Sequence, residues 1–162
     1  MSVIFSGNEL LEIALGIERN GAAFYKALAD KAQNKDAKAI YDYLANEEKK
    51  HLNTFQGMLN TVGSYKPPED YAAEYMLYLK SLVDSSVFSN ITEARQKAEK
   101  SSGETEALDT GVQAEKDSVL FYTEMLNFVR QPDQKIVLNI IDEEKAHIRQ
   151  LSQLKQRLQK KR

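Results

Sequence analysis

Both histidines of the chain follow a glutamate by three residues. They stand in two similar strings, Asn46-Glu-Glu-Lys-Lys-His51 and Asp142-Glu-Glu-Lys-Ala-His147. Residues three apart share one face of an α-helix, so each glutamate and its histidine can bind a metal ion from a single helix. The predicted ligands of these two strings are Glu48, His51, Glu144 and His147. Carboxylate and imidazole together suit iron or manganese better than a closed zinc site, which favours tetrahedral nitrogen and sulfur ligands.

A second repeated string supplies two further carboxylates. Glu18-Arg-Asn-Gly-Ala-Ala-Phe-Tyr25 is similar to Glu115-Lys-Asp-Ser-Val-Leu-Phe-Tyr122. The glutamates that open these strings are 97 positions apart, and those of the two histidine strings are 96 apart, which indicates an internal duplication. Each string ends on a tyrosine two helical turns beyond its glutamate. Tyr25 and Tyr122 are therefore predicted either to pack in the core or to donate hydrogen bonds to the ligand carboxylates.

All of these side chains lie within four stripes of apolar residues at helical spacing. The stripes predict helices over residues 7–33, 35–62, 104–130 and 132–159. Ser6 and Glu9 form a capping box before the first helix, and Asn34 can cap the second. Pro132 suits the first turn of the fourth helix. Only one or two residues join the helices within each pair, so each pair is predicted to form an antiparallel hairpin.

A long segment without a regular apolar period, residues 64–103, separates the two hairpins. Within it, residues 71–83 and 92–100 each predict a short helix. Such a segment can run the full length of a bundle, so we expect the third long helix to run parallel to the second. Tyr71, Tyr75 and Tyr78 are predicted to seat this crossover on the bundle. The predicted fold is all-α: one domain over residues 1–162, built as a four-helix bundle.

The two hairpin turns bring six residues with metal-binding side chains to one height in the bundle. In each hairpin, the glutamate of the first helix lies about 15 residues before the turn, and the Glu-x-x-His pair of the second helix lies about 12 to 16 residues after the turn. The two distances agree to within about one helical turn, so the side chains lie at the same height. The six residues are Glu18, Glu48, His51, Glu115, Glu144 and His147. Four ionised carboxylates in a core would repel one another and lose their hydration. Two divalent cations would neutralise them while both histidines stay neutral.

Other interpretations of these residues exist. A glutamate within an apolar stripe can be a neutral, hydrogen-bonded core acid, and a histidine can be a core residue with its hydrogen bonds satisfied. The six residues could also bind metal only to stabilise the bundle, without turnover. Glu47 and Glu143, which lie one position before Glu48 and Glu144, are predicted to face solvent or to contact a ligand from outside.

Composition narrows the classes of function. Hydrophobic residues make up 42% of the 162 residues, enough for one core, while zero cysteines exclude disulfides and thiolate metal sites in this sequence. Lys and Arg number 22 against 24 Asp and Glu, so the net charge of -2 gives no field for nucleic acid or an anionic membrane. No apolar stretch approaches the roughly 18 residues that a membrane span requires. We therefore expect a soluble, cytoplasmic protein.

The ligand pattern itself resembles a known family. One glutamate from each of two helices, with Glu-x-x-His from each of the other two, is the pattern of ferritin-like di-iron and di-manganese bundles. The sequence is most similar to the rubrerythrin group over essentially the whole chain. The matching motifs are Glu18 with Phe24-Tyr25, Glu48-x-x-His51, Glu115 with Phe121-Tyr122, and Glu144-x-x-His147. The resemblance implies a ferritin-like fold and a non-haem di-iron centre that reduces hydrogen peroxide, with Glu48 and Glu144 bridging and Glu18 and Glu115 terminal.

Two features of this sequence differ from the pattern of that family. Rubrerythrins typically carry a cysteine-rich rubredoxin domain, so here we expect electrons from a separate donor protein such as a rubredoxin. They also typically have a second glutamate one turn from the first on the third helix, where this chain has Val112 and Ser118. We expect a homodimeric oxidoreductase that acts on hydrogen peroxide or dioxygen. A ferroxidase or iron-handling protein, and manganese in place of iron, are the alternatives.

Overall fold

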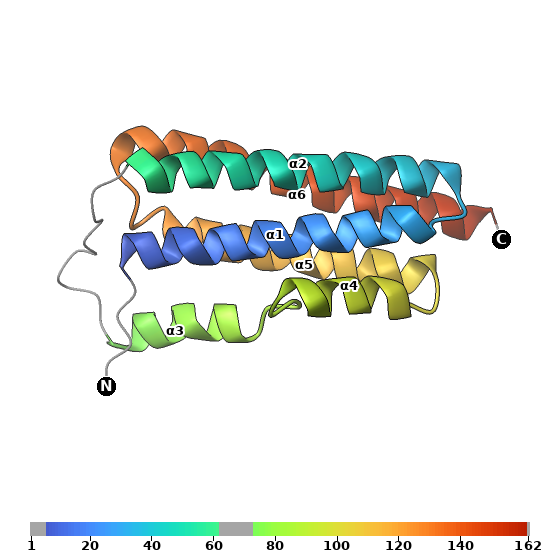
Figure 1. The fold of residues 1–162 in the computed structure, drawn as a ribbon, viewed down its shortest axis with the longest axis horizontal. Coiled ribbons are helices and arrows are strands. Elements are labelled where there is room, and N and C mark those ends of the chain that lie inside the picture. Colours follow the sequence, from blue (N-terminus) through green and yellow to red (C-terminus); the bar gives the residue numbers. More distant parts are fainter. Residues whose placement is uncertain (1–5, 62–72, 162) are drawn as a thin grey trace.

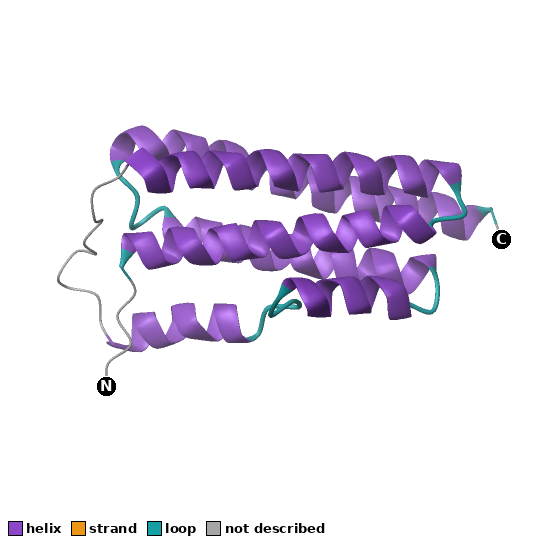
Figure 2. Cartoon of the chain, in the orientation of Figure 1, coloured by secondary structure: helices purple, strands orange, loops and turns teal. Residues whose placement is uncertain are grey.

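The structure, a computed structural model, describes residues 6–61 and 73–161. Helices occupy most of these residues, and no strand occurs among them. The helices are α1 (Gly7–Lys31), α2 (Lys35–Thr61), α3 (Ala73–Asp84), α4 (Ile91–Lys100), α5 (Glu104–Met125) and α6 (Gln131–Lys160) (Figure 1). Short loops join most of them (Figure 2). The four long helices and the two short ones are therefore confirmed, with differences at their ends.

The first two helices begin where the sequence predicts, because side chains satisfy their free backbone N–H groups. The Glu9 amide donates to Ser6 Oγ at 3.2 Å, and the Ser6 amide donates to Glu9 Oε2 at 2.6 Å, which completes the capping box. At the second helix, the Ala37 amide donates to Asn34 Oδ1 at 3.0 Å. The first helix ends at Lys31, two residues before the predicted end, where Ala32 adopts an extended backbone.

The predicted end of the third long helix is wrong. We expected this helix to continue to residue 130, but α5 ends at Met125. Beyond it, the Asn127 amide donates to Glu124 O and the Phe128 amide donates to Met125 O, so the chain closes in tighter three-residue turns. Val129 is nevertheless buried. Its burial continues the apolar stripe past the end of the helix, which is why periodicity alone predicted a longer one.

The long helices form two antiparallel hairpins joined by the crossover (Figure 1). α1 packs on α2, and α5 packs on α6. The crossover helices α3 and α4 run along the bundle, α3 against α5 and α4 against α1. The chain therefore enters α5 at the opposite end from where it leaves α2, and the two helices run in the same direction as predicted.

The short helix α3 contacts the bundle through different residues than expected. Met76 and Leu79 are buried, and the Tyr75 ring stacks on Phe128 with ring centres 6.2 Å apart. Tyr78, which we predicted to help seat the crossover, is 41% exposed. Tyr71 lies outside the described residues. The expected role of the tyrosines therefore holds for Tyr75 and is wrong for Tyr78.

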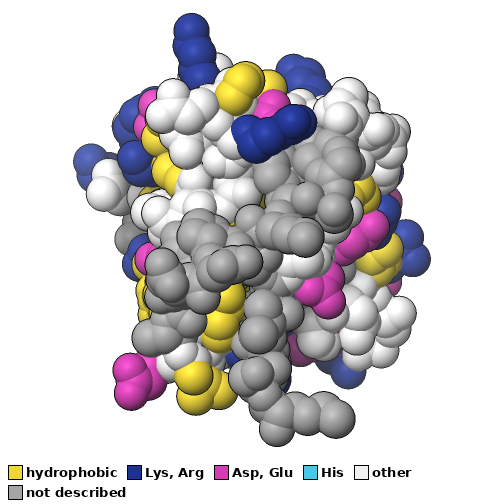
Figure 3. Space-filling model, turned by 90° about the vertical axis from the view of Figure 1, so that its left-hand side faces the viewer, with side chains coloured by type: hydrophobic (Ala, Val, Ile, Leu, Met, Phe, Trp, Pro, Cys, Tyr) yellow, Lys and Arg dark blue, Asp and Glu magenta, His cyan; other side chains and the backbone are white. Residues whose placement is uncertain are grey.

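The apolar core consists of two clusters, one toward each end of the bundle. One contains Leu11, Leu15, Phe55, Phe121 and Ile141 among others, and the other contains Phe24, Tyr41, Leu44, Leu108 and Leu151 among others. At the end of the bundle that Figure 3 faces, side chains of both charges are interspersed with hydrophobic and uncharged ones on the described part of the surface. None of the described helices is long and apolar enough to cross a membrane. The polar residues of interest lie along the helices between the two clusters.

Candidate metal centre

The structure brings the six predicted residues together inside the bundle. Glu18 comes from α1, Glu48 and His51 from α2, Glu115 from α5, and Glu144 and His147 from α6. All six are at most 4% exposed. The spacing of three residues turns each Glu-x-x-His pair inward from one helix face. Apolar residues above and below keep bulk water away from this level of the bundle.

The six side chains divide into two sets of four. One set is Glu18, Glu48, His51 and Glu144, and the other is Glu48, Glu115, Glu144 and His147. Within each set, one potential ligand atom per residue lies within 4.8 Å of the others. Glu48 and Glu144 belong to both sets, which is the arrangement expected of carboxylates shared between two cations. The geometry thus matches a pair of adjacent metal positions.

Buried side-chain atoms without a hydrogen-bond partner show whether metal ions fit at this level of the bundle. Glu18 Oε2, His51 Nδ1 and Glu144 Oε1 are buried without a hydrogen-bond partner. His51 Nδ1 lies 3.2 Å from Glu144 Oε1 and 3.5 Å from Glu18 Oε2. Buried polar atoms normally have partners, and oxygen and imidazole nitrogen are the donors that iron and manganese accept. Two divalent cations therefore fit the donor set.

Burial and mutual repulsion govern the carboxyl groups in the metal-free protein. Burial raises the pKa values of Glu18 and Glu48, the latter strongly, and it raises the pKa of Glu144 to about 8 with help from neighbouring carboxylates. Burial acts in the same direction on Glu115, but His147, Glu144 and Tyr25 together outweigh it and leave its pKa lowered. Without metal, protons must replace part of the missing positive charge.

The histidines hold some of those protons. Burial lowers the pKa of each imidazole, but the surrounding carboxylates outweigh it. The nearby carboxylates of Glu144, Glu18 and Glu48 raise the pKa of His51. Contacts with Glu115 and Glu144 raise the pKa of His147 to about 11. Binding metal through these nitrogens would release the protons, so metal affinity should increase with pH.

Two tyrosines cross between the hairpins to support the outer carboxylates. The Tyr25 hydroxyl on α1 donates to Glu115 Oε1 on α5, and the Tyr122 hydroxyl on α5 donates to Glu18 Oε1 on α1. Both tyrosines are fully buried, and burial raises their pKa values, so both hydroxyls keep their protons. The two roles left open for these residues, core packing and hydrogen bonding to carboxylates, therefore both occur.

The neighbouring glutamates do not share one environment. Glu143 Oε2 lies 2.7 Å from His51 Nε2, and its side chain is 53% exposed, so it contacts a predicted ligand from outside. Glu47 was expected either to face solvent or to make such a contact. Its side chain is only 12% exposed and pairs with Lys50. That expectation is wrong because a cation one helical turn away engages the carboxylate of Glu47.

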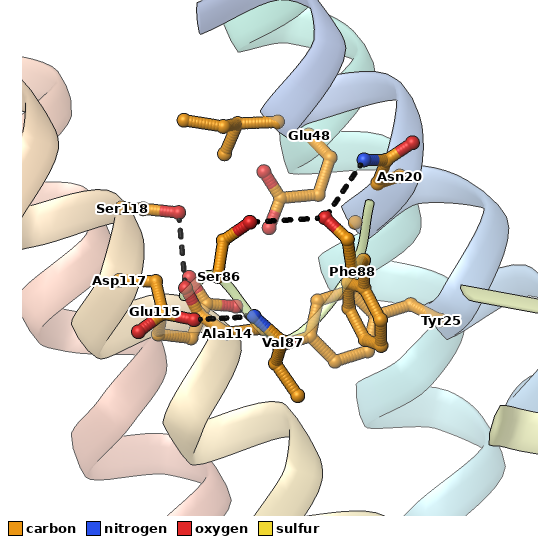
Figure 4. Close-up of a pocket in the computed structure, with 12 residues that line it drawn as sticks. Asn20, Tyr25, Glu48, Ser86, Val87, Phe88, Ala114, Glu115, Asp117 and Ser118 are labelled. Carbon is orange, nitrogen blue, oxygen red and sulfur yellow. Dashed lines mark hydrogen bonds between the residues drawn. The ribbon is translucent and has the colours of Figure 1, made fainter. Parts of the chain in front are cut away.

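A small pocket adjoins the candidate centre and was not predicted from the sequence (Figure 4). Its volume is about 30 Å³, and Glu48 and Glu115 form part of its wall. The loop between α3 and α4 covers it, where the Val87 amide donates to Asp117 Oδ2 at 2.8 Å. Asn20 Nδ2 donates to the carbonyl oxygen of the next residue in that loop at 3.4 Å.

Comparison with known proteins agrees with the ligand pattern. Residues 9–155 match the family described as Rubrerythrin. The chain belongs to the rubrerythrin family. Among solved structures, it is similar to a ferritin-like diiron-carboxylate protein from Thermotoga maritima, with 27% identity and a TM-score of 0.70 over 94% of this chain and 95% of that one. A search of curated proteins gave no match.

Membership in the rubrerythrin family confirms the ferritin-like, all-helical fold that the sequence predicts. Together with the buried carboxylate and histidine cluster, it supports a di-metal site in this rubrerythrin-family chain. Ser118 occupies one of the two positions on α5, with Val112, where the family pattern led us to look for a further glutamate. It lines the small pocket, and its hydroxyl donates to the Ala114 carbonyl oxygen.

Proposed function

We propose that this chain binds two iron ions at the six buried residues and reduces hydrogen peroxide. The observation that carries the proposal is the pair of four-residue sets that share Glu48 and Glu144. Glu18 and Glu115 would be terminal ligands, each held by a tyrosine from the other hairpin. We further propose that electrons come from a separate donor protein such as a rubredoxin, because the 162 residues of this sequence include no cysteine that could hold a thiolate-bound redox centre.

The proposed reaction converts hydrogen peroxide, two protons and two electrons to two water molecules. Two bound iron(II) ions would supply one electron each. Tyr25 and Tyr122 fix the orientation of the terminal carboxylates through hydrogen bonds, and the apolar clusters on both sides exclude bulk water. The donor protein must then return two electrons for the next turnover.

The adjoining pocket supports a small, polar oxidant. Its volume of about 30 Å³ is enough for roughly two water molecules, and thus for one hydrogen peroxide molecule. Asn20, Ser86 and Ser118 contribute polar side chains to the lining. Hydrogen peroxide both donates and accepts hydrogen bonds, whereas dioxygen is a weak acceptor. These polar side chains, set in an otherwise largely apolar lining, therefore favour peroxide over dioxygen as the oxidant.

Anaerobic loading with Fe(II), followed by stopped-flow mixing with each oxidant, tests the proposal. We expect two iron ions per chain, a faster reaction with hydrogen peroxide than with dioxygen, and retention of both irons after oxidation. Faster reaction with dioxygen and loss of oxidised iron to solution would favour a ferroxidase. Stable binding without reaction would indicate a structural metal site. Parallel loading with Mn(II) compares the two metals.

A further inference from the structure

Glu47 and Glu143 occupy equivalent positions in the two halves of the chain. Each directly precedes a shared carboxylate and lies four residues before a histidine. If the duplication had preserved their contacts, each would pair with the histidine of the other hairpin. Only one of them does.

Glu143 reaches from α6 to the outer edge of His51 on α2. His51 Nε2 and Glu143 Oε2 are 2.7 Å apart, a hydrogen-bond distance. The other ring nitrogen, Nδ1, faces the interior and lies 3.2 Å from Glu144 Oε1. A proton on Nε2 can thus be donated to Glu143, which leaves the lone pair of Nδ1 directed at the centre.

Glu47 is held away from this role by a neighbour on its own helix. Lys50, one turn further along α2, donates a hydrogen bond to Glu47 Oε1. Within residues 6–61 and 73–161, no ion pair joins Glu47 to His147. The residue equivalent to Lys50 in the second half is Ala146, so Glu143 has no such cation one turn away on its own helix.

We propose that Glu143 is a positioning residue that orients His51 and makes the metal position at His51 the tighter of the two. The carboxylate fixes the ring and its protonated nitrogen, and it increases the electron density of the nitrogen that faces the centre. His147 lacks an equivalent partner among the described residues, so the two metal positions are inequivalent. This inference rests on the proposed metal centre, but it does not depend on peroxide reduction.

Calorimetric titration with Co(II) under anaerobic conditions tests the proposal on the full chain. We expect wild type to bind two ions in two distinguishable steps. Glu143→Ala should weaken the tighter step by about 10- to 100-fold, the usual cost of removing a carboxylate behind a ligand histidine. The matched variant Glu47→Ala should leave both steps within about threefold of wild type, because Glu47 pairs with Lys50 rather than with a ligand.

A spectroscopic readout separates positioning from a general loss of structure. In Zn(II)-loaded protein labelled with ¹⁵N at histidine, Glu143→Ala should shift the Nε2–H signal of His51 and speed its exchange with solvent, while His147 stays unchanged. Glu143→Gln keeps an oxygen acceptor without the charge, so it should bind Co(II) more tightly than Glu143→Ala does.

Two results would overturn the inference. If Glu143→Ala binds both Co(II) ions as wild type does, or if Glu47→Ala weakens binding equally, Glu143 has no special role. Failure of wild type to bind two metal ions would reject the inference together with the proposed centre. Two bound ions without peroxide reduction would reject the proposed function alone and leave the inference standing.

Discussion

The hairpin of α1 and α2 and the hairpin of α5 and α6 present matching side chains to the space between them. Each contributes two carboxylates and one imidazole, and each sends a tyrosine hydroxyl to a glutamate of the other. Away from the centre the match weakens. Glu143 contacts a histidine while Glu47 pairs with a lysine. A pair of cations would constrain the inward positions equally, whereas outward positions can differ without disturbing the shared carboxylates.

The loop between α3 and α4 shows the same contrast in its contacts with the two hairpins. Asn20 and Asp117 are equivalent residues, each two positions after a candidate ligand, and both contact this loop. Asn20 donates to a loop carbonyl oxygen, but Asp117 accepts from a loop amide. One asymmetric loop lies against two similar helices, so the equivalent positions need opposite hydrogen-bonding groups.

The largest effect should follow removal of a shared carboxylate. Glu48→Ala and Glu144→Ala each take a ligand from both sets, so each variant should lose the rise in melting temperature that metal gives the wild type. The two variants should behave alike because their positions are equivalent. Differential scanning calorimetry with and without Mn(II) measures the rise. Glu47→Ala should retain most of it, and an equal loss in that variant would show that the ligand set is wrong.

The metal-free protein should lose stability as the pH rises. The pKa of Glu144 is raised from 4.5 to about 8. Its contribution to the free energy of unfolding is therefore fully present below pH 4.5 and is lost as the pH rises through 8. The pKa of His147 is raised from 6.5 to about 11, so its contribution is lost as the pH rises from 6.5 through 11. Metal binding needs the deprotonated ligands, so the loaded protein should not follow this decline.

Thermal unfolding at about pH 6 and pH 8.5 checks this dependence, with chelator or with saturating Mn(II). The difference in melting temperature between loaded and metal-free protein should be larger at the higher pH. Glu115, whose pKa is lowered, contributes in the opposite sense only near and below its usual value of 4.5, outside this range. A constant difference between the two pH values would contradict the proton release.

The inward residues could be predicted from the sequence because two regular constraints define them. A spacing of three residues places Glu48 and His51 on one face, and equal distances from the hairpin turns bring the four helices to one height. The structure brings all six together. The ligand roles of these residues stay a prediction that metal titration must test.

The outward features could not be predicted because they depend on contacts without a sequence period. The burial of Glu47 depends on which group its carboxylate contacts. Lys50 forms an ion pair with this carboxylate and so competes with other possible partners. The pocket depends on a loop whose backbone follows no repeat. The end of α5 depends on backbone hydrogen bonds that shorten from four residues to three, while Val129 continues the apolar stripe.

A smaller and symmetrical effect is expected from the two crossing tyrosines. Tyr25→Phe and Tyr122→Phe each remove a hydroxyl that donates to a buried carboxylate. A hydrogen bond to a charged group contributes about 1.5 to 3 kcal/mol, so each variant should lose roughly this free energy of unfolding. Urea unfolding of the metal-loaded protein, followed by circular dichroism, measures the loss.

Tyr41→Phe is the control for the tyrosine pair. Its hydroxyl donates to Glu104 Oε2 at 2.7 Å, but Glu104 is partly exposed, so water can replace the missing hydroxyl. The loss should therefore be smaller than for either crossing tyrosine. If Tyr25→Phe and Tyr122→Phe differed by more than about 1 kcal/mol, the two hairpins would not support their carboxylates equally.

The smallest effect should come from Lys50→Ala, which gives the first hairpin the alanine that the second has at position 146. Without the lysine, the Glu47 carboxylate becomes free to turn toward His147. The weaker Co(II) step should then tighten by a few fold, because a single added contact to an imidazole contributes about 1 kcal/mol. Lys50 also lies near Glu143, so the tighter step should change less than in Glu143→Ala. A wider gap between the two steps would mean that Lys50 does not cause the asymmetry between the hairpins.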